Sequence, residues 1–394
     1  MSLYNLLQLV CLLLPVAAMS GWYFGKRSAK AVANQHENAL SSDYYAGLNF
    51  LLNEQTDKAV DAFIRMLDVS PDSVETTLAL GSFFRRRGEV DRAIRIHQNL
   101  LAKPNLTTKQ RNQSLLELAQ NYLRAGVYDR AEALLLEITS TTGDHLETSL
   151  RHLIDIYERE KDWKKAIESS MRLQEVIGFT VSKEIAHYYC ELAELAWSKG
   201  KIRLAHRYLK TSLRHDKHCA RASLLQGNFE KKCSKYEQAL RAYQRIEYQD
   251  AAFLPEVLLM IIECYEKMDA KEGLAQYLDY LMRECPTISI VLASADHMKN
   301  NQGKEKAAHF LANQLFEQPS IRGLKHLIEY HLARVVGDVR NELLMLKSLV
   351  EQLVEKKPIY RCGECGFSSR LLHWQCPSCR EWSQVKPIQG IEGE

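Results

Sequence analysis

A repeat of about 34 residues runs through most of this chain and constrains its fold more than any other feature. A small apolar residue recurs at a nearly even spacing, and it is alanine at every position but one. The recurring positions are Ala59, Ala93, Ala131, Ala166, Ala205, Ala239, Leu274 and Ala307. A period in this range is typical of stacked structural repeats, in which each unit buries its apolar face against its neighbours.

Other residue types keep a fixed distance from these recurring positions. Nine residues earlier lies an aromatic side chain in five units, at Phe50, Phe84, Tyr122, Tyr157 and Tyr265. Twelve residues earlier lies a small residue in several units, at Gly47, Gly81, Ala119, Ala193 and Gly227. Four residues later lies a bulky residue in most units, among them Phe63, Leu135, Leu209, Tyr243 and Leu278. Small residues let two helices approach closely, while aromatic and aliphatic residues fill the space between helix pairs.

Glycines occur where a turn between two helices is required, at Gly88, Gly126 and Gly200. Segments such as LGSFFRRRGEVDRAIRIHQNLLAKP and AGLNFLLNEQTDKAVDAFIRMLDVSP therefore resemble the tetratricopeptide repeat. Eight units run from about residue 43 to 319, and a divergent ninth pair at about 320–356 is expected to cap the array. The longer separations indicate loop insertions around Lys103–Arg111 and Gly178–Lys183.

The sequence thus predicts an all-α superhelical solenoid of about nine tetratricopeptide repeats over residues 43–356. Glycine and proline together make up about 7% of the chain, against an average near 12%, which argues against a sandwich, a barrel or a disordered chain. A solenoid offers a concave groove for peptide or protein segments, and a spacer without a ligand is the alternative.

The charge balance is close to even, with 52 basic and 49 acidic residues and a formal net charge of +3. This is a weak electrostatic footprint for nucleic acid, and we expect no nucleic-acid partner. The run Arg85–Arg87 could form a phosphate or nucleic-acid patch. Because Glu89 and Asp91 follow it, a solvated helix end is the favoured interpretation.

The amino terminus contains an uncharged stretch that extends from Leu3 to Phe24. As a helix it would be about 33 Å long, which matches a bilayer core of about 30 Å. Lys26, Arg27 and Lys30 follow it and no charged side chain precedes it, so the bulk of the chain should face the cytoplasm. We therefore predict a single-pass transmembrane anchor at 1–24 and a juxtamembrane segment at 25–42. A cleaved signal peptide, the alternative, would begin with a basic region that this sequence lacks.

Four of the ten cysteines lie close to the carboxy terminus as two C-x-x-C pairs, Cys362 with Cys365 and Cys376 with Cys379. Four thiolates at this spacing can form a tetrahedral site for one metal ion per chain, zinc or iron. We predict a four-cysteine ribbon at 358–385, stabilised largely by its metal, and a tail at 386–394. Tyr360, Phe367, Trp374 and Trp382 could supply its small apolar cluster.

The role of this ribbon is less constrained than its ligand set. A closed four-cysteine site leaves no position for a reacting water, so hydrolytic catalysis is not expected. Electron transfer would require iron, and nucleic-acid binding would need more than Arg361, Arg370 and Arg380. A structural module that docks on the solenoid or presents a protein-binding surface is the favoured interpretation.

The anchor ending GWYFGKR, the repeats and the ribbon YRCGECGF…WQCPSCREW together resemble the lipopolysaccharide assembly protein B family of Gram-negative bacteria. The ribbon is also similar to a shortened rubredoxin, but Arg380 stands where rubredoxin knuckles carry their second glycine. This resemblance implies a non-enzymatic adaptor at the inner membrane that regulates lipopolysaccharide, and hence lipid A, biosynthesis. It further implies that the adaptor promotes degradation of the lipid A pathway deacetylase by an FtsH-type membrane protease. The family is also thought to gather other lipopolysaccharide biosynthetic or transport proteins at the cytoplasmic face.

Overall fold

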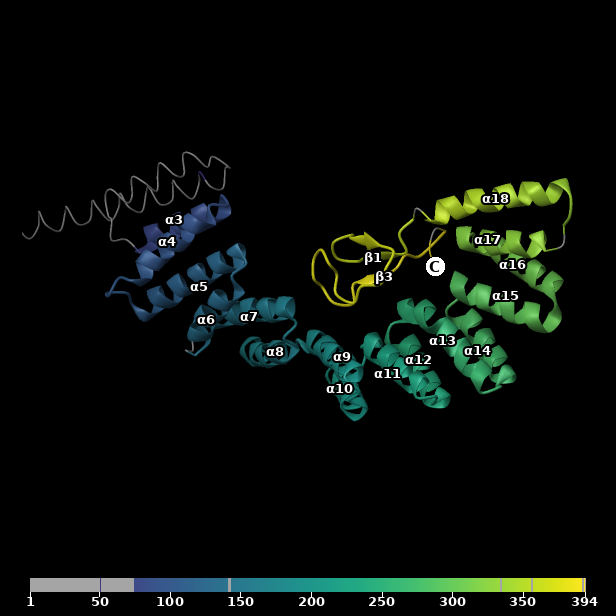
Figure 1. Ribbon diagram of the computed structural model, residues 1–394, viewed down its shortest axis with the longest axis horizontal. Helices are drawn as coiled ribbons and strands as arrows, with labels where there is room; N and C mark the ends of the chain where they lie inside the picture. The colour runs from purple at the N-terminus through teal and green to yellow at the C-terminus, as the bar shows by residue number, and fades with distance from the viewer. Residues whose placement is uncertain are drawn as a thin grey trace, which may run out of the picture. The chain divides into compact units, whose positions relative to one another are not determined.

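The computed structural model describes residue 50 and the ranges 74–140, 143–333, 335–355 and 357–391, together with residue 393. Helices follow one another along the chain until a small β-sheet close to its end (Figure 1). The chain divides into two compact units, the first ending at Glu160 and the second beginning at Lys161. The predicted anchor at 1–24 and juxtamembrane segment at 25–42 lie outside the described residues.

The described helices of the first unit are α3 (Val74–Arg86), α4 (Val90–Leu101), α5 (Thr108–Ala125), α6 (Tyr128–Thr139) and α7 (Leu146–Glu160). The second unit begins with α8 (Trp163–Ile177), α9 (Ser182–Ser198), α10 (Ile202–His215), α11 (Ala220–Lys232) and α12 (Tyr236–Gln249). It continues through the short 3₁₀ helix η1 (Ala251–Phe253), α13 (Leu254–Lys267), α14 (Lys271–Glu284), α15 (Ile288–Gln302), α16 (Lys304–Glu317), α17 (Ile321–Leu332) and α18 (Asp338–Glu355). No helix in these ranges is both long enough and apolar enough to cross a membrane.

The recurring positions of the sequence mark the same place in every described repeat. Each is the fourth residue of the second helix of a pair, in α4, α6, α8, α10, α12, α14 and α16. The alanines at these positions are fully buried, and Leu274, the one recurring residue that is not alanine, is 5% exposed. Ala59, the first of the series, lies outside the described residues. The predicted helix pairs are therefore confirmed wherever the structure describes them.

The small residue twelve positions earlier contacts the bulky residue four positions later. A Cβ atom placed on Gly81 would collide with the ring of His97, and one placed on Gly227 would collide with the ring of Tyr243. Both rings are fully buried against the glycine that faces them. In these two pairs the helices can approach so closely because one of them lacks a side chain at this point.

The turn within a pair requires one residue in the left-handed region, five positions before the recurring residue. Gly88, Gly126 and Gly200 adopt φ values of 87°, 76° and 71°, as the turn prediction requires. Three other repeats place Lys161, Ser234 and Asp269 at this position, with φ values of 58°, 60° and 50°. The turn therefore fixes a backbone conformation, and glycine is its least strained occupant.

The core of the second unit consists of successive clusters between neighbouring helix pairs. The largest described cluster joins α11–α15 and includes Tyr243, Phe253, Leu254 and Ile261. The last pair, α17 and α18, buries Ile328, Leu332 and Val350, in keeping with the predicted terminal pair. Stacked clusters of this kind are expected when each repeat buries its apolar face on the next one.

A three-stranded antiparallel sheet follows the helices, with strand order β2-β1-β3. Its strands are β1 (Tyr360–Cys362), β2 (Ser368–Ser369) and β3 (Val385–Pro387). Tyr360 is paired with Ser369 on one side and with Pro387 on the other. The third strand extends beyond the ribbon boundary expected at 385, because Lys386 and Pro387 continue the pairing with β1. Beyond it, the carbonyl of Ile391 accepts a hydrogen bond from the N–H of Ile321 at 3.0 Å, so the end of the chain returns to α17.

Candidate metal centre

Two turns of the ribbon have the same local structure and present two cysteines each. In the first, the N–H of Cys362 donates to the carbonyl of Phe367 (2.8 Å) and the N–H of Gly366 donates to the carbonyl of Cys362 (3.1 Å). The same two bonds recur in the second turn. There Cys376 donates to Glu381 and Arg380 donates to Cys376, both at 2.9 Å. Strand β1 leads into the first turn, and each turn directs both of its sulfurs to one side.

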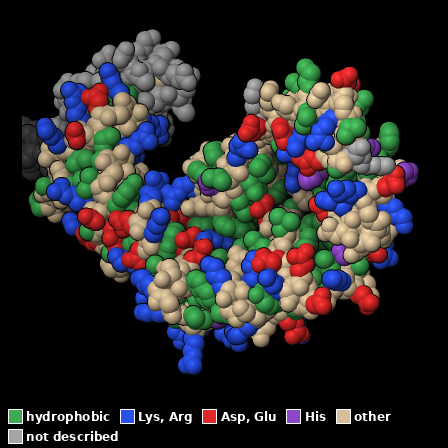
Figure 2. All heavy atoms as spheres, turned by 45° about the vertical axis from the view of Figure 1, so that its right-hand side comes forward, with side chains coloured by type: hydrophobic (Ala, Val, Ile, Leu, Met, Phe, Trp, Pro, Cys, Tyr) green, Lys and Arg blue, Asp and Glu red, His purple; other side chains and the backbone are tan. Residues whose placement is uncertain are grey.

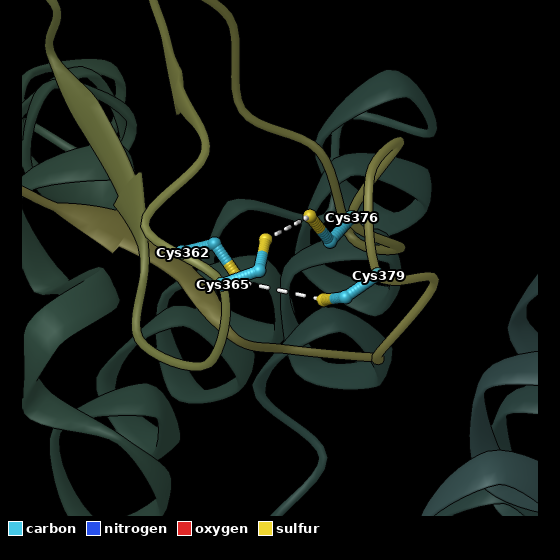
Figure 3. A group of neighbouring side chains, drawn as sticks. All are labelled: Cys362, Cys365, Cys376 and Cys379. Atoms are coloured by element: carbon cyan, nitrogen blue, oxygen red, sulfur yellow. Dashed lines mark hydrogen bonds between the residues drawn. The ribbon is translucent and has the colours of Figure 1, made fainter. Parts of the chain in front are cut away.

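The four predicted cysteines converge on one point (Figure 3). All four Sγ atoms lie within 4.8 Å of one another. Across the two turns, Cys362 Sγ lies 3.7 Å from Cys379 Sγ, and Cys365 Sγ lies 3.6 Å from Cys376 Sγ. Sulfurs bound tetrahedrally to zinc at about 2.3 Å lie about 3.8 Å apart, whereas a disulfide would require about 2.05 Å. The spacing and the donor set fit one tetrahedral metal ion.

The sulfurs differ in exposure and in acidity. Cys362 and Cys376 are buried, while Cys365 is exposed and Cys379 is partly exposed. A hydrogen bond from the backbone N–H of Phe367 is the main cause that lowers the pKa of Cys365 to about 6. The N–H of Glu381 acts on Cys379 in the same direction, but desolvation and the three neighbouring thiols outweigh it and raise the pKa of Cys379 to about 12. Four clustered thiols resist full ionisation without a cation, so metal binding should release protons from this site.

The second turn departs from the first at Arg380. Gly366 has a φ of 75° and Arg380, at the equivalent place in the second turn, has a φ of 65°. Both positions therefore require the left-handed conformation. A glycine adopts it freely, whereas for a residue with a Cβ it costs about 1–2 kcal/mol.

The aromatic cluster expected inside the ribbon forms only in part. Tyr360 packs with Cys362, Cys376 and Val385, and Phe367 borders this cluster. The two tryptophans instead face the helices of the second unit, which corrects the expectation that all four aromatic residues would pack together. A ribbon this small cannot enclose two indole rings, so they are buried against the repeats.

Trp382 is the centre of this contact with the repeats and is only 4% exposed. Its ring stacks on His187 with centroids 4.8 Å apart. It also forms edge-to-face contacts with Trp163 and Tyr188, whose ring centroids lie 6.3 Å and 5.9 Å from its own. Trp374 packs on Phe253 at 4.9 Å. The ribbon is thus docked on the helices of the second unit, one of the two arrangements that the sequence left open.

Polar contacts tie the ribbon to the same surface. Ser383 Oγ lies 2.7 Å from Nε2 of His187, and the hydroxyl of Tyr360 donates to Glu256 at 2.7 Å. The Nζ atom of Lys386 lies 2.7 Å from Asp250 Oδ2. Burial, followed by the charges of Arg221 and Lys183, holds the pKa of His187 well below its usual range, so its ring is neutral and Nε2 can accept a hydrogen bond from the hydroxyl of Ser383.

Three of the residues that receive the ribbon share one position in three successive repeats. His187 in α9, Arg221 in α11 and Glu256 in α13 each lie eighteen positions before the recurring residue of their repeat. The guanidinium of Arg221 lies over the ring of Trp382 at 5.9 Å and is bound by Glu191 at 2.8 Å and by Glu194. We shall call His187, Arg221 and Glu256 the docking row.

Sequence reasoning missed the docking row, although the period contained a signal for it. A histidine, an arginine and a glutamate at one repeat position on successive helices form a polar row on one face of the array. The same spacing that identified the buried alanines could have identified this row, because each position of a repeat lies on one line along the array.

Comparison with known proteins agrees with this architecture. Residues 360–387 match the rubredoxin metal-binding domain family, and residues 76–110 and 190–255 match tetratricopeptide repeat families. Lipopolysaccharide assembly protein B of Escherichia coli (strain K12) is 40% identical over 98% of this chain and 100% of its own length. Lipopolysaccharide assembly protein B of Haemophilus influenzae is 34% identical, again over 98% of this chain and 100% of its own length. On this similarity over nearly the whole chain, the protein belongs to the lipopolysaccharide assembly protein B family.

Proposed function

We propose that this chain is a non-enzymatic adaptor in lipopolysaccharide assembly, which holds proteins of that pathway on its repeats. The observation that carries the proposal is the 40% identity over 98% of the chain to lipopolysaccharide assembly protein B of E. coli. Arrays of tetratricopeptide repeats provide extended surfaces for protein segments, which suits such a role. Delivery of partners, rather than chemistry on a substrate, would then be the activity.

Cys362, Cys365, Cys376 and Cys379 would hold one zinc or iron ion. When bound, the ion would cross-link the two turns of the ribbon, and four thiolates would leave it no open position for a reacting water. The ribbon then acts as a rigid block. Its surface around Trp374 and Trp382 is occupied by the second unit, so the ribbon braces the repeats from within the same chain.

The proposal also covers how the chain is attached to the membrane and which proteins it binds. The uncharged stretch from Leu3 to Phe24 would anchor the chain in the bacterial inner membrane, with the repeats on the cytoplasmic side. The partners would be an FtsH-type membrane protease and the lipid A pathway deacetylase, together with other lipopolysaccharide biosynthesis or transport proteins. A tether raises the effective concentration of partners on the same membrane without any new contact, which is the physical advantage of an anchored adaptor.

A depletion experiment tests delivery directly. Loss of this protein should lengthen the half-life of the deacetylase and raise its amount, while the specific activity of the enzyme stays the same. A chain lacking residues 1–24 is the matched variant, which should fold but restore degradation poorly. An unchanged half-life accompanied by raised lipopolysaccharide would refute delivery and favour direct inhibition or scaffolding of the pathway.

Topology can be tested independently of partners. Protease added to intact spheroplasts should spare residues 31–394, and the same protease should digest them after the membrane is opened. Digestion from outside in intact spheroplasts would contradict the proposed orientation.

The two alternative functions make different demands. A rubredoxin-like electron carrier would need iron, so function restored by a chain loaded only with zinc would exclude electron transfer. A nucleic-acid-binding protein would present a surface dominated by positive charge. The face in Figure 2 instead shows basic and acidic side chains interspersed over the described helices, which favours the adaptor.

A further inference from the structure

The first unit carries three arginines at one position of three successive repeats. Arg86 in α3, Arg124 in α5 and Arg159 in α7 each lie seven positions before the recurring residue of their repeat. They line one hollow of about 880 Å³, together with Arg85, Tyr128 and Asp155 among others. We shall call Arg86, Arg124 and Arg159 the arginine row.

The charges in this hollow are only partly compensated. Arg85, expected to lie at a solvated helix end, is mostly buried and pairs with Glu117 at 2.7 Å. Arg159 binds Asp155 at 2.9 Å and lies over the ring of Tyr128. Arg86 and Arg124 are exposed and form no ion pair with any residue that the structure describes. Two guanidinium groups therefore face the hollow with their donors available.

A helix dipole explains part of this arrangement. The arginine row lies at the carboxy-terminal ends of its helices, where positive charge is favoured by about 0.3–1 kcal/mol. The same repeat position in the second unit holds Ser198, Lys232, Lys267 and Asn300. A general preference for positive charge would be met equally by lysine. Three arginines in succession favour planar, bidentate recognition of carboxylates.

We propose that this hollow binds an extended segment of a protein partner whose acidic side chains pair with the arginine row. Neighbouring packed helices lie about 10 Å apart, and an extended chain in the polyproline II conformation advances about 3.1 Å per residue with three residues per turn, so that every third side chain lies on the same face. Acidic residues at every third position of such a segment would therefore match the row. The proposal rests on the adaptor function, because it identifies a surface with which the adaptor would hold a partner.

Features of the hollow favour a peptide over a nucleic acid. Asp155 lines it and Glu117 lies beside it, so a chain with a phosphate at every residue would meet repulsion. Tyr128 is the aromatic side chain in its lining, and it is already covered by the guanidinium of Arg159. A peptide can place its carboxylates opposite the arginines and neutral residues opposite the acids.

The test uses the full-length protein in detergent and a fluorescein-labelled heptapeptide with Glu at positions 1, 4 and 7 and Ser elsewhere. Fluorescence anisotropy should show binding that weakens with salt. The double variant Arg86→Gln with Arg124→Gln should lose affinity on the order of tenfold or more, because two charge-assisted contacts are removed. The matched control is Lys232→Gln with Lys267→Gln, which removes the same charge from the equivalent repeat position and should leave affinity unchanged. Circular dichroism checks that both variants remain helical.

Two results would overturn the proposal. Equal losses in the arginine and lysine variants, or no loss in either, would show that binding is not located at the arginine row. Tighter binding of a single-stranded ten-nucleotide RNA than of the peptide, abolished by the arginine variant, would assign the hollow to nucleic acid.

Capture of the lipid A deacetylase from solubilised membranes separates this proposal from the adaptor function. If the wild type and the arginine variant capture the enzyme equally, the hollow is not the site that holds it and the adaptor function stands. If the wild type captures no deacetylase while the peptide still binds, the deacetylase is not a partner of this adaptor, and the arginine row remains a carboxylate site. Capture by the wild type that is lost only in the arginine variant supports both.

Discussion

At the scale of single residues, the two turns of the ribbon carry different amounts of backbone strain. Gly366 and Arg380 have the same left-handed conformation, yet only Gly366 adopts it without cost. The second turn has a side chain at this position, so other interactions must offset the backbone strain at Arg380.

The change Gly366→Ala should destabilise the ribbon by about 1 kcal/mol, because it puts a Cβ atom on a left-handed residue. A Cβ at this position meets no atom within 4 Å, so the cost is backbone strain alone. Gly363→Ala is the control, since its Cβ would meet Gln384 Oε1 at an ordinary 3.5 Å. Metal release to a chelator should be faster in the first variant only. Equal rates would show that the turn is not strained by a side chain.

The change Cys376→Ser should abolish tight metal binding, because Cys376 is a fully buried member of the four-sulfur group and three thiolates bind far less well. The ribbon has few other buried residues and should loosen, whereas the helices should keep their circular dichroism signal. Metal analysis of the purified chain measures the effect, with Cys285→Ser, which changes a cysteine outside the four-sulfur group, as the control. An unchanged metal content in Cys376→Ser would contradict the assignment of the ligands.

At the scale of elements, the contact between α9 and the ribbon depends on a neutral histidine. The pKa of His187 is held well below its usual 6.5 by burial and by Arg221 and Lys183. At a pH between the lowered pKa of the folded state and 6.5, the unfolded chain binds a proton at His187 and the folded chain does not. Stability contributed by this contact is therefore fully present above pH 6.5 and is lost as the pH falls below it.

Lowering the pH from 7.5 to 5.5 should cost the wild type about 1 kcal/mol through His187 alone. His187→Gln should remove this share of the pH dependence, because glutamine does not titrate. Urea unfolding at the two pH values measures the difference, and the exposed His309→Gln provides the control. His97, His152, His215 and His326, whose pKa values are also lowered by burial, contribute equally to all three chains. A pH dependence as steep in His187→Gln as in the wild type would show that His187 does not carry it.

At the scale of the molecule, one indole ring connects the ribbon with helices far away in sequence. Trp382 touches Trp163 in α8 and both His187 and Tyr188 in α9, helices that lie near the start of the second unit. The ribbon is therefore part of the second unit rather than an appendage, and its detachment should expose apolar surface on both sides.

The change Trp382→Ala should cost about 3 kcal/mol of stability in the second unit, as is usual for a buried indole. The metal content should stay at one ion per chain, because the ring lies outside the four-sulfur group. Limited proteolysis should then cut the chain between α18 and the ribbon, which the wild type resists. Leu371→Ala, at a ribbon residue that is 70% exposed, should behave like the wild type. Loss of metal in Trp382→Ala would mean that docking and metal binding form a single folding unit.

Much of the fold could be predicted because it depends on local chemistry repeated many times. The buried alanines, the facing pairs such as Gly227 with Tyr243, and the turn glycines each recur at a fixed spacing. Lys161, Ser234 and Asp269 were missed as turn residues because the turn selects a backbone angle, which residue type reveals only when it is glycine. The metal ligands could be predicted because two C-x-x-C pairs bring their sulfurs together with little help from the rest of the chain.

The sequence by itself determined the repeat, its helix pairs, the four cysteines and the family, since each is encoded within a short stretch of the chain. Only the tertiary structure decided where the ribbon lies and which arginines line a common hollow. Glu256 and Tyr360 are 104 residues apart, and His187 and Ser383 are 196 apart, yet each pair is in hydrogen-bonding contact. The physical reason is that these contacts depend on how successive repeats stack, and stacking brings residues together by their position in the repeat and not by their distance along the chain.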